Sequence, residues 1–284
     1  MESGHIDAAS FPGPIDLAGT LESGQTFLWL PIGDGWYRTV DGETVIEVRG
    51  AGDGLDWRSN GDPVPAVRER LGLEDDLPAI LAAFPDEPVV QAARERLAGL
   101  RLVSEPAVPT VFSFILSAQM RIERIRKLVT ALRRTYGDSI RWNGTSVPRF
   151  PAPRALADTT EAELRDLGLG YRAPYVRETA EMLAEDALDL DAVATEPYEA
   201  ARERLTELVG VGPKVADCVL LFGMEFEEPV PLDTWIRQAI EEYFPAADRG
   251  DYAETSRAIR DRLGPQSGYA QTYVFTHLRT REGA

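Results

Sequence analysis

Alternating hydrophobic and polar positions near the N-terminus predict short β-strands, at residues 26–30, 36–40 and 44–48. The sequences Gly33-Asp34-Gly35 and Asp41-Gly42 separate these segments, and an Asp-Gly pair in such a place is a strong signal for a β-hairpin. Residues 50–61 are rich in glycine and aspartate, so we expect a loop there that leads toward a further strand. The N-terminal part of the chain therefore predicts a small antiparallel β-sheet.

From about Val67 the hydrophobic residues recur every three or four positions, which is typical of helices, and this spacing continues to the C-terminus. A long helical region at residues 111–136 contains Ser117, near which we expect a break. Further helical segments are predicted at residues 161–168, 173–187, 198–225, 233–243, 252–263 and 268–279. The predicted fold class is α+β, with an antiparallel β subdomain and short helices at residues 1–98 and a mostly helical domain at residues 99–284.

A glycine-rich turn interrupts the helical segment at residues 198–225 and makes it a hairpin. The sequence Leu-Val-Gly-Val-Gly-Pro-Lys-Val-Ala-Asp-Cys occupies positions 208–218. Gly210 and Gly212 allow a turn that most side chains forbid, and Pro213 suits the first turn of the next helix. Free amides at the start of a helix bind anions such as phosphate, and we assign these contacts to Gly210, Gly212 and Val215. A plain helical hairpin with a tight turn is the alternative interpretation.

Lys214 follows this turn and is one of only two lysines, with Lys127, among 30 basic residues. Arginine is effectively always protonated, whereas a buried lysine can lose its proton and act as a nucleophile. Because burial disfavours the ammonium form, we expect apolar neighbours to lower the pKa of Lys214. Asp233 lies nineteen positions later and could stabilise a cation that forms during attack on carbon. Each residue has a simpler alternative, a solvated lysine and an aspartate that caps the next helix.

Together with Val-Pro-Leu-Asp at positions 230–233, the hairpin sequence resembles the helix-hairpin-helix DNA glycosylase superfamily of base-excision repair. The resemblance is strongest to the 8-oxoguanine branch and extends from about residue 15 to residue 278. It implies that Lys214 attacks C1′ of a damaged nucleotide and that Asp233 stabilises the cationic sugar. A Schiff base then forms and β-elimination cuts the strand, so the resemblance implies a bifunctional DNA glycosylase and AP lyase.

The resemblance also assigns the residues that recognise the damaged base, which such enzymes extrude from the duplex. The sequence Ser-Gly-Gln-Thr-Phe-Leu-Trp at positions 23–29 matches a family motif in which the Gly24 carbonyl accepts from N7–H of 8-oxoguanine. Gln271 and Phe275, four positions apart on the last helix, match the glutamine for the base edge and the phenylalanine for stacking. Cys218 matches the opposite wall of the pocket. The alternatives are a strand entry, a buried helix face and a small core residue.

A second group of residues matches those that hold the opposite strand. The resemblance assigns Gln119, in place of the more usual asparagine, to fill the space left by the base, and Arg124 to the opposite cytosine. The sequence Gly-Leu-Gly-Tyr-Arg at positions 168–172 gives Tyr171 as the wedge and Arg172 as the second arginine. Trp235 replaces the more usual histidine two positions after the aspartate. Since tryptophan cannot become cationic, we expect a phosphate contact there to be weakened or rearranged.

The composition limits the possible environment and cofactors. The net charge is −17, from 47 acidic and 30 basic residues, and such a chain repels nucleic acid unless salt screens the repulsion. We therefore expect a protein adapted to high salt. A single cysteine excludes an internal disulfide and a four-cysteine iron–sulfur cluster, and two histidines argue against a zinc site. Neither a metal nor a cofactor is expected.

The expected partner is double-stranded DNA with a damaged base, bound by a cytoplasmic monomer. No hydrophobic segment approaches the roughly 18 residues that a membrane-spanning helix needs. Three alternatives remain open. The same scaffold could serve a glycosylase for alkylated purines or oxidised pyrimidines, or a DNA-binding module without chemistry. The negative charge by itself favours a protein that never meets nucleic acid.

Overall fold

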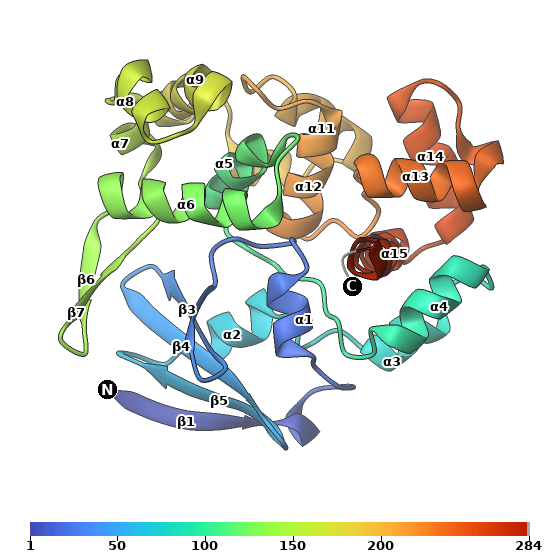
Figure 1. Cartoon of the computed structure of the whole chain (residues 1–284), viewed down its shortest axis with the longest axis horizontal. Helices are drawn as coiled ribbons and strands as arrows, with labels where there is room; N and C mark the ends of the chain where they lie inside the picture. Colours follow the sequence, from blue (N-terminus) through green and yellow to red (C-terminus); the bar gives the residue numbers. More distant parts are fainter. Residues whose placement is uncertain (283–284) are drawn as a thin grey trace.

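The computed structural model describes residues 1–282, and its N-terminal part contains a five-stranded antiparallel sheet (Figure 1). Hydrophobic side chains of the sheet pack against α1 (Leu17–Glu22) and α2 (Val64–Arg70). The predicted antiparallel sheet is therefore confirmed. Its strands lie in the order β1-β5-β4-β3-β2, with β1 at Glu2–Asp7, β2 at Leu30–Gly33, β3 at Trp36–Asp41, β4 at Thr44–Ala51 and β5 at Gly54–Ser59.

Three details of the sheet differ from the prediction. Residues 26–29 form no strand, because the Thr26 hydroxyl accepts from the Leu28 N–H at 3.1 Å and bends the chain locally. Residues 50–61 are not mainly a loop, since they contain the end of β4 and all of β5. The sequence pattern does not predict β1, because Ile6 alone is buried in this edge strand. A local hydrogen bond thus prevents a strand that the alternation predicts at residues 26–29. The edge strand β1 is missed because only one of its side chains is buried.

Helices form most of the remaining chain, as the hydrophobic spacing predicts. The break near Ser117 is confirmed, because α5 ends there and α6 begins at Ile122. A small hairpin of β6 (Ser139–Trp142) and β7 (Thr145–Pro148) packs on the sheet through Trp142 and Val45. The helices after α2 are α3 Leu77–Ala82, α4 Pro88–Arg96, α5 Ala107–Ser117, α6 Ile122–Tyr136, α7 Pro153–Ala157, α8 Glu161–Asp166, α9 Ala173–Ala184, α10 Leu190–Val193, α11 Tyr198–Leu205, α12 Pro213–Gly223, α13 Thr234–Tyr243, α14 Tyr252–Leu263 and α15 Ser267–Glu282, with short 3-10 helices η1 Ala8–Ser10, η2 Gly170–Arg172 and η3 Pro245–Ala247.

The buried hydrophobic side chains divide into two main cores. The first lies between the sheet, α1 and α2, and its members run from Ile6 to Leu73. The second joins the helices and also includes Phe27 and Leu28 from the N-terminal part. Buried residues of α3 and α4 belong to this second core. We keep the boundary between residues 98 and 99 as a proposal, and residues 283 and 284 of the proposed helical domain lie outside the described residues.

A buried polar network joins the two cores. Arg70 of α2 forms an ion pair with Glu105, and their side chains are only 4% and 1% exposed. Arg70 Nε donates to the Glu105 carboxylate at 2.9 Å, and the Thr26 hydroxyl donates to the same carboxylate at 2.6 Å. Arg133 of α6 donates to the Leu28 carbonyl at 2.9 Å. These contacts fix the chain at residues 26–28 against the helical domain.

We expect Glu105→Gln to destabilise the protein, because it leaves the Arg70 guanidinium buried without a counter-charge. The free energy of unfolding should fall by about 3 kcal/mol or more. Glu161→Gln is the control, since Glu161 pairs with Arg165 on the exposed surface and should contribute less than about 1 kcal/mol. Urea denaturation measures both losses. Similar losses for the two variants would contradict the role of the buried network.

Candidate active site

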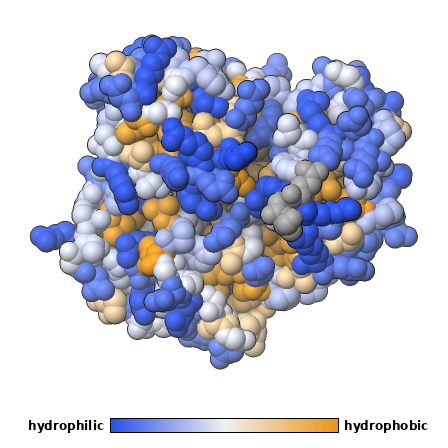
Figure 2. Space-filling view, viewed as in Figure 1, coloured by the Kyte–Doolittle hydropathy of each residue, from blue (hydrophilic) through white to orange (hydrophobic). Residues whose placement is uncertain are grey.

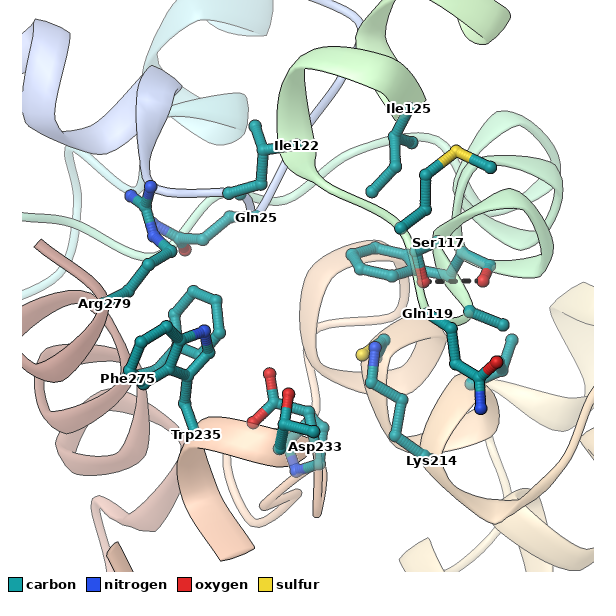
Figure 3. Close-up of a pocket in the computed structure, with 18 of the residues that line it drawn as sticks. Gln25, Ser117, Gln119, Ile122, Ile125, Lys214, Asp233, Trp235, Phe275 and Arg279 are labelled. Carbon is teal, nitrogen blue, oxygen red and sulfur yellow. Dashed lines mark hydrogen bonds between the residues drawn. The ribbon is translucent and has the colours of Figure 1, made fainter. Parts of the chain in front are cut away.

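A cavity of about 950 Å³ opens where the N-terminal part of the chain meets the helical domain. Its wall is formed by the chain around Gly24, the turn between α5 and α6, the first turns of α12 and α13, and one face of α15. Figure 3 shows Lys214 and Asp233 pointing into the same space from different helices. The structure thus brings together many of the residues singled out in the sequence: Gly24, Gln119, Lys214, Val215, Cys218, Asp233, Trp235, Gln271 and Phe275.

The two glycines of the hairpin turn have different structural roles. The hairpin is confirmed, because α11 ends at Leu205 and α12 begins at Pro213. Gly210 has a φ of +82°, and a Cβ added there would lie 2.6 Å from Tyr175. Gly212 has a φ of −91°, and an added Cβ would meet nothing within 4 Å. Only Gly210 therefore needs the backbone freedom of glycine, whereas the surface above Gly212 is open.

Lys214 is the second residue of α12, and its half-buried side chain lines the cavity. Its Nζ lies 5.4 Å from the centre of the Phe114 ring. Burial lowers the pKa of Lys214, but Cys218 and the Asp233 carboxylate raise it, and the net pKa lies above its ordinary value. Burial thus lowers this pKa in the expected direction, but the neighbouring groups outweigh it and the net shift is upward. The ammonium has to lose a proton before it can attack carbon.

Asp233 both caps a helix and faces the amine. Its carboxylate accepts from the Ile236 N–H at 2.8 Å, which fixes the side chain at the start of α13. Burial raises the pKa of Asp233, while the Lys214 ammonium and the N–H groups of Ile236 and Trp235 lower it, and the net pKa is raised. Asp233 therefore caps α13 and also lies opposite Lys214 (Figure 3). The sequence alone offers these two roles as alternatives.

Gly24 and Gln25 form the side of the cavity that comes from the N-terminal part. Gly24 has a φ of +104°, and an added Cβ would lie 2.7 Å from Ile122. The Gln25 amide nitrogen donates to the Arg101 carbonyl at 3.0 Å, and its oxygen accepts from the Val103 N–H at 3.2 Å. The Gln25 side chain therefore holds the backbone next to Gly24 against residues 101–103. Sequence reasoning assigns it no role, although its place in the 23–29 motif is a signal that could reveal one.

Gln271 and Phe275 lie on the cavity side of α15, as their spacing predicts. Gln271 is buried, and its amide nitrogen donates to the Gly268 carbonyl at 3.2 Å and to the Thr272 hydroxyl at 2.6 Å. The amide oxygen of Gln271 is thus the atom suited to accept a hydrogen bond from a ligand. The Arg279 guanidinium, one turn further on, lies 5.8 Å from the centre of the Phe275 ring.

Cys218 and Trp235 complete the wall of the cavity. Cys218 lies one turn beyond Lys214, and burial raises the pKa of its thiol to about 11. The thiol is therefore neutral near neutral pH and offers a small, polarisable surface. Figure 3 shows Trp235 on the same side of the cavity as Phe275 and across from Lys214. Trp235 adds an aromatic surface to the cavity.

The residues assigned to the opposite strand differ in exposure: Gln119, Arg124 and Tyr171 are exposed, whereas Arg172 is buried. Gln119 lines the cavity, is exposed, and has a φ of +52° in the turn between α5 and α6. Arg124 and Arg172 each donate to a backbone carbonyl, at 3.3 Å for Arg124. The Arg172 guanidinium also lies 4.3 Å from the centre of the Tyr171 ring. Tyr171 is 54% exposed, so its ring is accessible to a partner.

Comparison with known proteins identifies the family. The family described as "HhH-GPD superfamily base excision DNA repair protein" matches residues 112–265, which is more than half of the chain. The chain belongs to this superfamily. A probable N-glycosylase/DNA lyase of Methanothermobacter thermautotrophicus is 33% identical over 297 aligned positions, which cover 94% of this chain and 94% of that protein.

Two solved structures of similar proteins share nearly the whole fold. The apo form of an 8-oxoguanine glycosylase/lyase of Clostridium acetobutylicum has a TM-score of 0.86 and 25% identity, and the match covers 97% of this chain and 96% of that one. MBOgg1 in complex with a low affinity DNA ligand has a TM-score of 0.88 and 27% identity, with 99% and 100% covered. The similarity to HhH-GPD proteins thus includes the N-terminal sheet as well as the helical part.

Two further properties of this HhH-GPD protein apply to residues 1–282. No helix in this range is long and apolar enough to cross a membrane. The same range contains no group of three or more His, Cys, Asp or Glu side chains placed to hold a metal ion.

We expect Gly210→Ala to destabilise the hairpin, because alanine is strained at a positive φ and its Cβ would clash with Tyr175. The free energy of unfolding should fall by at least about 2 kcal/mol. Gly212→Ala is the control, with an expected loss of less than about 1 kcal/mol from a poorer helix cap. Thermal and urea denaturation compare the two variants. An equal loss in both would show that the turn does not distinguish the two glycines.

Proposed function

We propose that this protein is a bifunctional DNA glycosylase and AP lyase that removes 8-oxoguanine opposite cytosine in double-stranded DNA. One observation carries this proposal: the Lys214 amine and the Asp233 carboxylate point into the same cavity, which Gly24 and Phe275 also line. The similar proteins support it, since they are described as an N-glycosylase/DNA lyase and as an 8-oxoguanine glycosylase/lyase.

Lys214 supplies the nucleophile in this proposal. After it loses a proton, Nζ attacks C1′, the glycosidic bond breaks, and the base leaves with the bonding electrons and takes up a proton. Opening of the sugar ring and loss of a further N–H proton give a Schiff base between Nζ and C1′. Removal of a C2′ proton then breaks the C3′–O bond and cuts the strand on its 3′ side. The ionised Asp233 stabilises the positive charge on the sugar in the first step.

Two hydrogen-bond acceptors would select the damaged base. 8-Oxoguanine has an N7–H donor, whereas guanine has a lone pair there, and leaving the Gly24 carbonyl unpaired costs about 1–3 kcal/mol. The Gln271 amide oxygen would accept from the donors on the base edge, because its nitrogen is engaged within α15. The Phe275 ring and the Cys218 thiol would contact the two faces of the base.

In this proposal Arg124 and Arg172 recognise the opposite cytosine. Arg124 donates one N–H group to the Gly168 carbonyl, and Arg172 donates one to the Ala118 carbonyl. Arg172 Nε is buried and has no hydrogen-bond partner among the described residues. The O2 and N3 atoms of cytosine are acceptors for the guanidinium N–H groups that do not bind these carbonyls. A base with a donor at the same position would leave the arginines unpaired.

The remaining contacts with DNA are proposed from exposure and backbone geometry. Tyr171 would enter the duplex as a wedge, and Gln119 would fill the space that the extruded base leaves. The backbone at Gly210, Gly212 and Val215 would bind a phosphate, because the first amides of α12 lack partners within the helix. The open surface above Gly212 allows the DNA backbone to approach closely.

Lys214→Gln tests the proposed nucleophile. Borohydride should link the wild-type protein covalently to a duplex that contains 8-oxoguanine, and the variant should show no linked product, because an amide forms no Schiff base. Asp233→Asn should keep DNA binding but slow excision by about 100-fold or more, since a charge that stabilises the transition state is lost. Equal covalent trapping of Lys214→Gln would place the nucleophile elsewhere.

A panel of damaged duplexes tests the substrate. We expect excision of 8-oxoguanine opposite cytosine and little release of 3-methyladenine or thymine glycol, because those bases lack the N7–H donor that 8-oxoguanine offers to the Gly24 carbonyl. Preferred release of 3-methyladenine or thymine glycol would favour the alkylated-purine or oxidised-pyrimidine alternative on the same scaffold. Binding without any release would favour a DNA-binding module.

We also propose that the protein acts as a monomer in a cytoplasm of high salt concentration. The charge of −17 supports this proposal, and Figure 2 shows hydrophilic residues over most of the visible face. We expect the melting temperature to rise from about 0.1 M to about 2 M KCl, because salt screens repulsion between carboxylates. Fold and excision activity that are unchanged at low salt would contradict this adaptation, and gel filtration tests the monomer.

A further inference from the structure

Tyr252, the first residue of α14, connects the two segments that carry Lys214 and Asp233. Its hydroxyl donates to the Asp217 carboxylate at 2.7 Å and accepts from the Leu232 N–H at 3.2 Å. Asp217 lies on α12, three residues after Lys214, and Leu232 directly precedes Asp233. One hydroxyl group therefore links the helix of the amine to the backbone next to the carboxylate.

The Asp217 side chain is held in place by burial and by hydrogen bonds to both of its oxygens. Its side chain is fully buried, and the Tyr198 hydroxyl donates to its other oxygen at 2.8 Å. Burial raises the pKa of Asp217 to about 6, although the hydrogen bonds from Tyr252 and Tyr198 lower it, and Arg202 lies 4.0 Å away. A buried carboxylate is costly unless its oxygens are hydrogen-bonded, so the two tyrosine hydroxyls hold it in one orientation.

The link acts on a segment that has little freedom. Leu232 is buried, and the Asp233 N–H donates to the Pro231 carbonyl at 2.8 Å in a tight turn. The Asp233 carboxylate then caps α13 through Ile236. A shift of the Leu232 amide would therefore be transmitted to the Asp233 carboxylate, and a misplacement of about 1 Å in an active site can cost about 100-fold in rate.

We propose that Tyr252 is a positioning residue, whose hydroxyl sets the separation between the Lys214 amine and the Asp233 carboxylate by joining the Leu232 amide to the Asp217 carboxylate. The proposal rests on the proposed function, because it concerns the geometry of the same amine and carboxylate. Neither Tyr252 nor Asp217 is among the described residues that line the cavity. Tyr252 therefore acts through other residues, without contact with the substrate.

Tyr252→Phe tests this role, and Tyr198→Phe is the matched control. Each variant removes one hydroxyl that donates to Asp217 and accepts from a second group, which is the Leu232 N–H for Tyr252 and the Arg202 guanidinium for Tyr198. We expect similar decreases in melting temperature for both. With enzyme in excess over an 8-oxoguanine duplex, Tyr252→Phe should slow excision by about tenfold or more, and Tyr198→Phe by less than about twofold. Binding to a duplex with an uncleavable abasic analogue should stay within about twofold of wild type in both.

Each outcome of this experiment has a defined meaning. Equal slowing by the two variants would reduce Tyr252 to a partner of the buried carboxylate, and a wild-type rate in Tyr252→Phe would overturn the proposal directly. If Tyr252→Phe does not fold, Asp217→Asn serves instead. It keeps one oxygen acceptor but weakens the anchor, and a wild-type rate would again overturn the proposal. The proposed function is tested separately, by whether the wild-type protein releases 8-oxoguanine. The excision rates of the variants relative to wild type can be measured on any damaged base that the wild-type protein releases.

Discussion

The placement of the Lys214 amine opposite the Asp233 carboxylate, in one cavity, is the constraint on which the rest of the site depends. A charge in a buried place is acceptable only when an opposite charge or hydrogen bonds compensate it. The pKa of Lys214 is raised partly by Asp233, and the Lys214 ammonium opposes the effect of burial on the pKa of Asp233. Since the two groups belong to different helices, their separation depends on elements that never touch a substrate.

The side of the cavity that would select the base has a similar dependence on distant contacts. Gly24 belongs to the N-terminal part of the chain, yet it faces side chains of α6 and α15. Its position follows from the Gln25 amide, which holds the chain at residues 101–103, and from the buried Glu105 carboxylate, which binds Arg70 and Thr26. Polar groups between two hydrophobic cores thus fix the width of the cavity, because buried hydrogen bonds have strict directions.

The features that the sequence predicts correctly depend on residues that are close together in the chain. The helical hairpin, the cap at Asp233 and the cavity side of Gln271 each depend on residues within a few positions of one another. The raised pKa of Lys214 depends instead on the balance between burial, which lowers it, and three neighbours, Cys218, Asp233 and Asp217, which raise it. The link through Tyr252 joins positions 217, 232 and 252, so no local pattern reveals it.

The negative charge of the chain and a DNA substrate are compatible because the charge is unevenly distributed. The charged residues that line the cavity are four basic and two acidic ones, a local balance of +2 in a chain of −17: Arg121, Lys214, Arg237, Arg279, Glu123 and Asp233. High salt shortens the range of electrostatic interactions to about 3 Å at 1 M. Repulsion from the distant acidic surface is then screened, while the cavity itself keeps its local positive charge. A protein of this composition can therefore bind DNA through a local surface whose charge is opposite to that of the whole molecule.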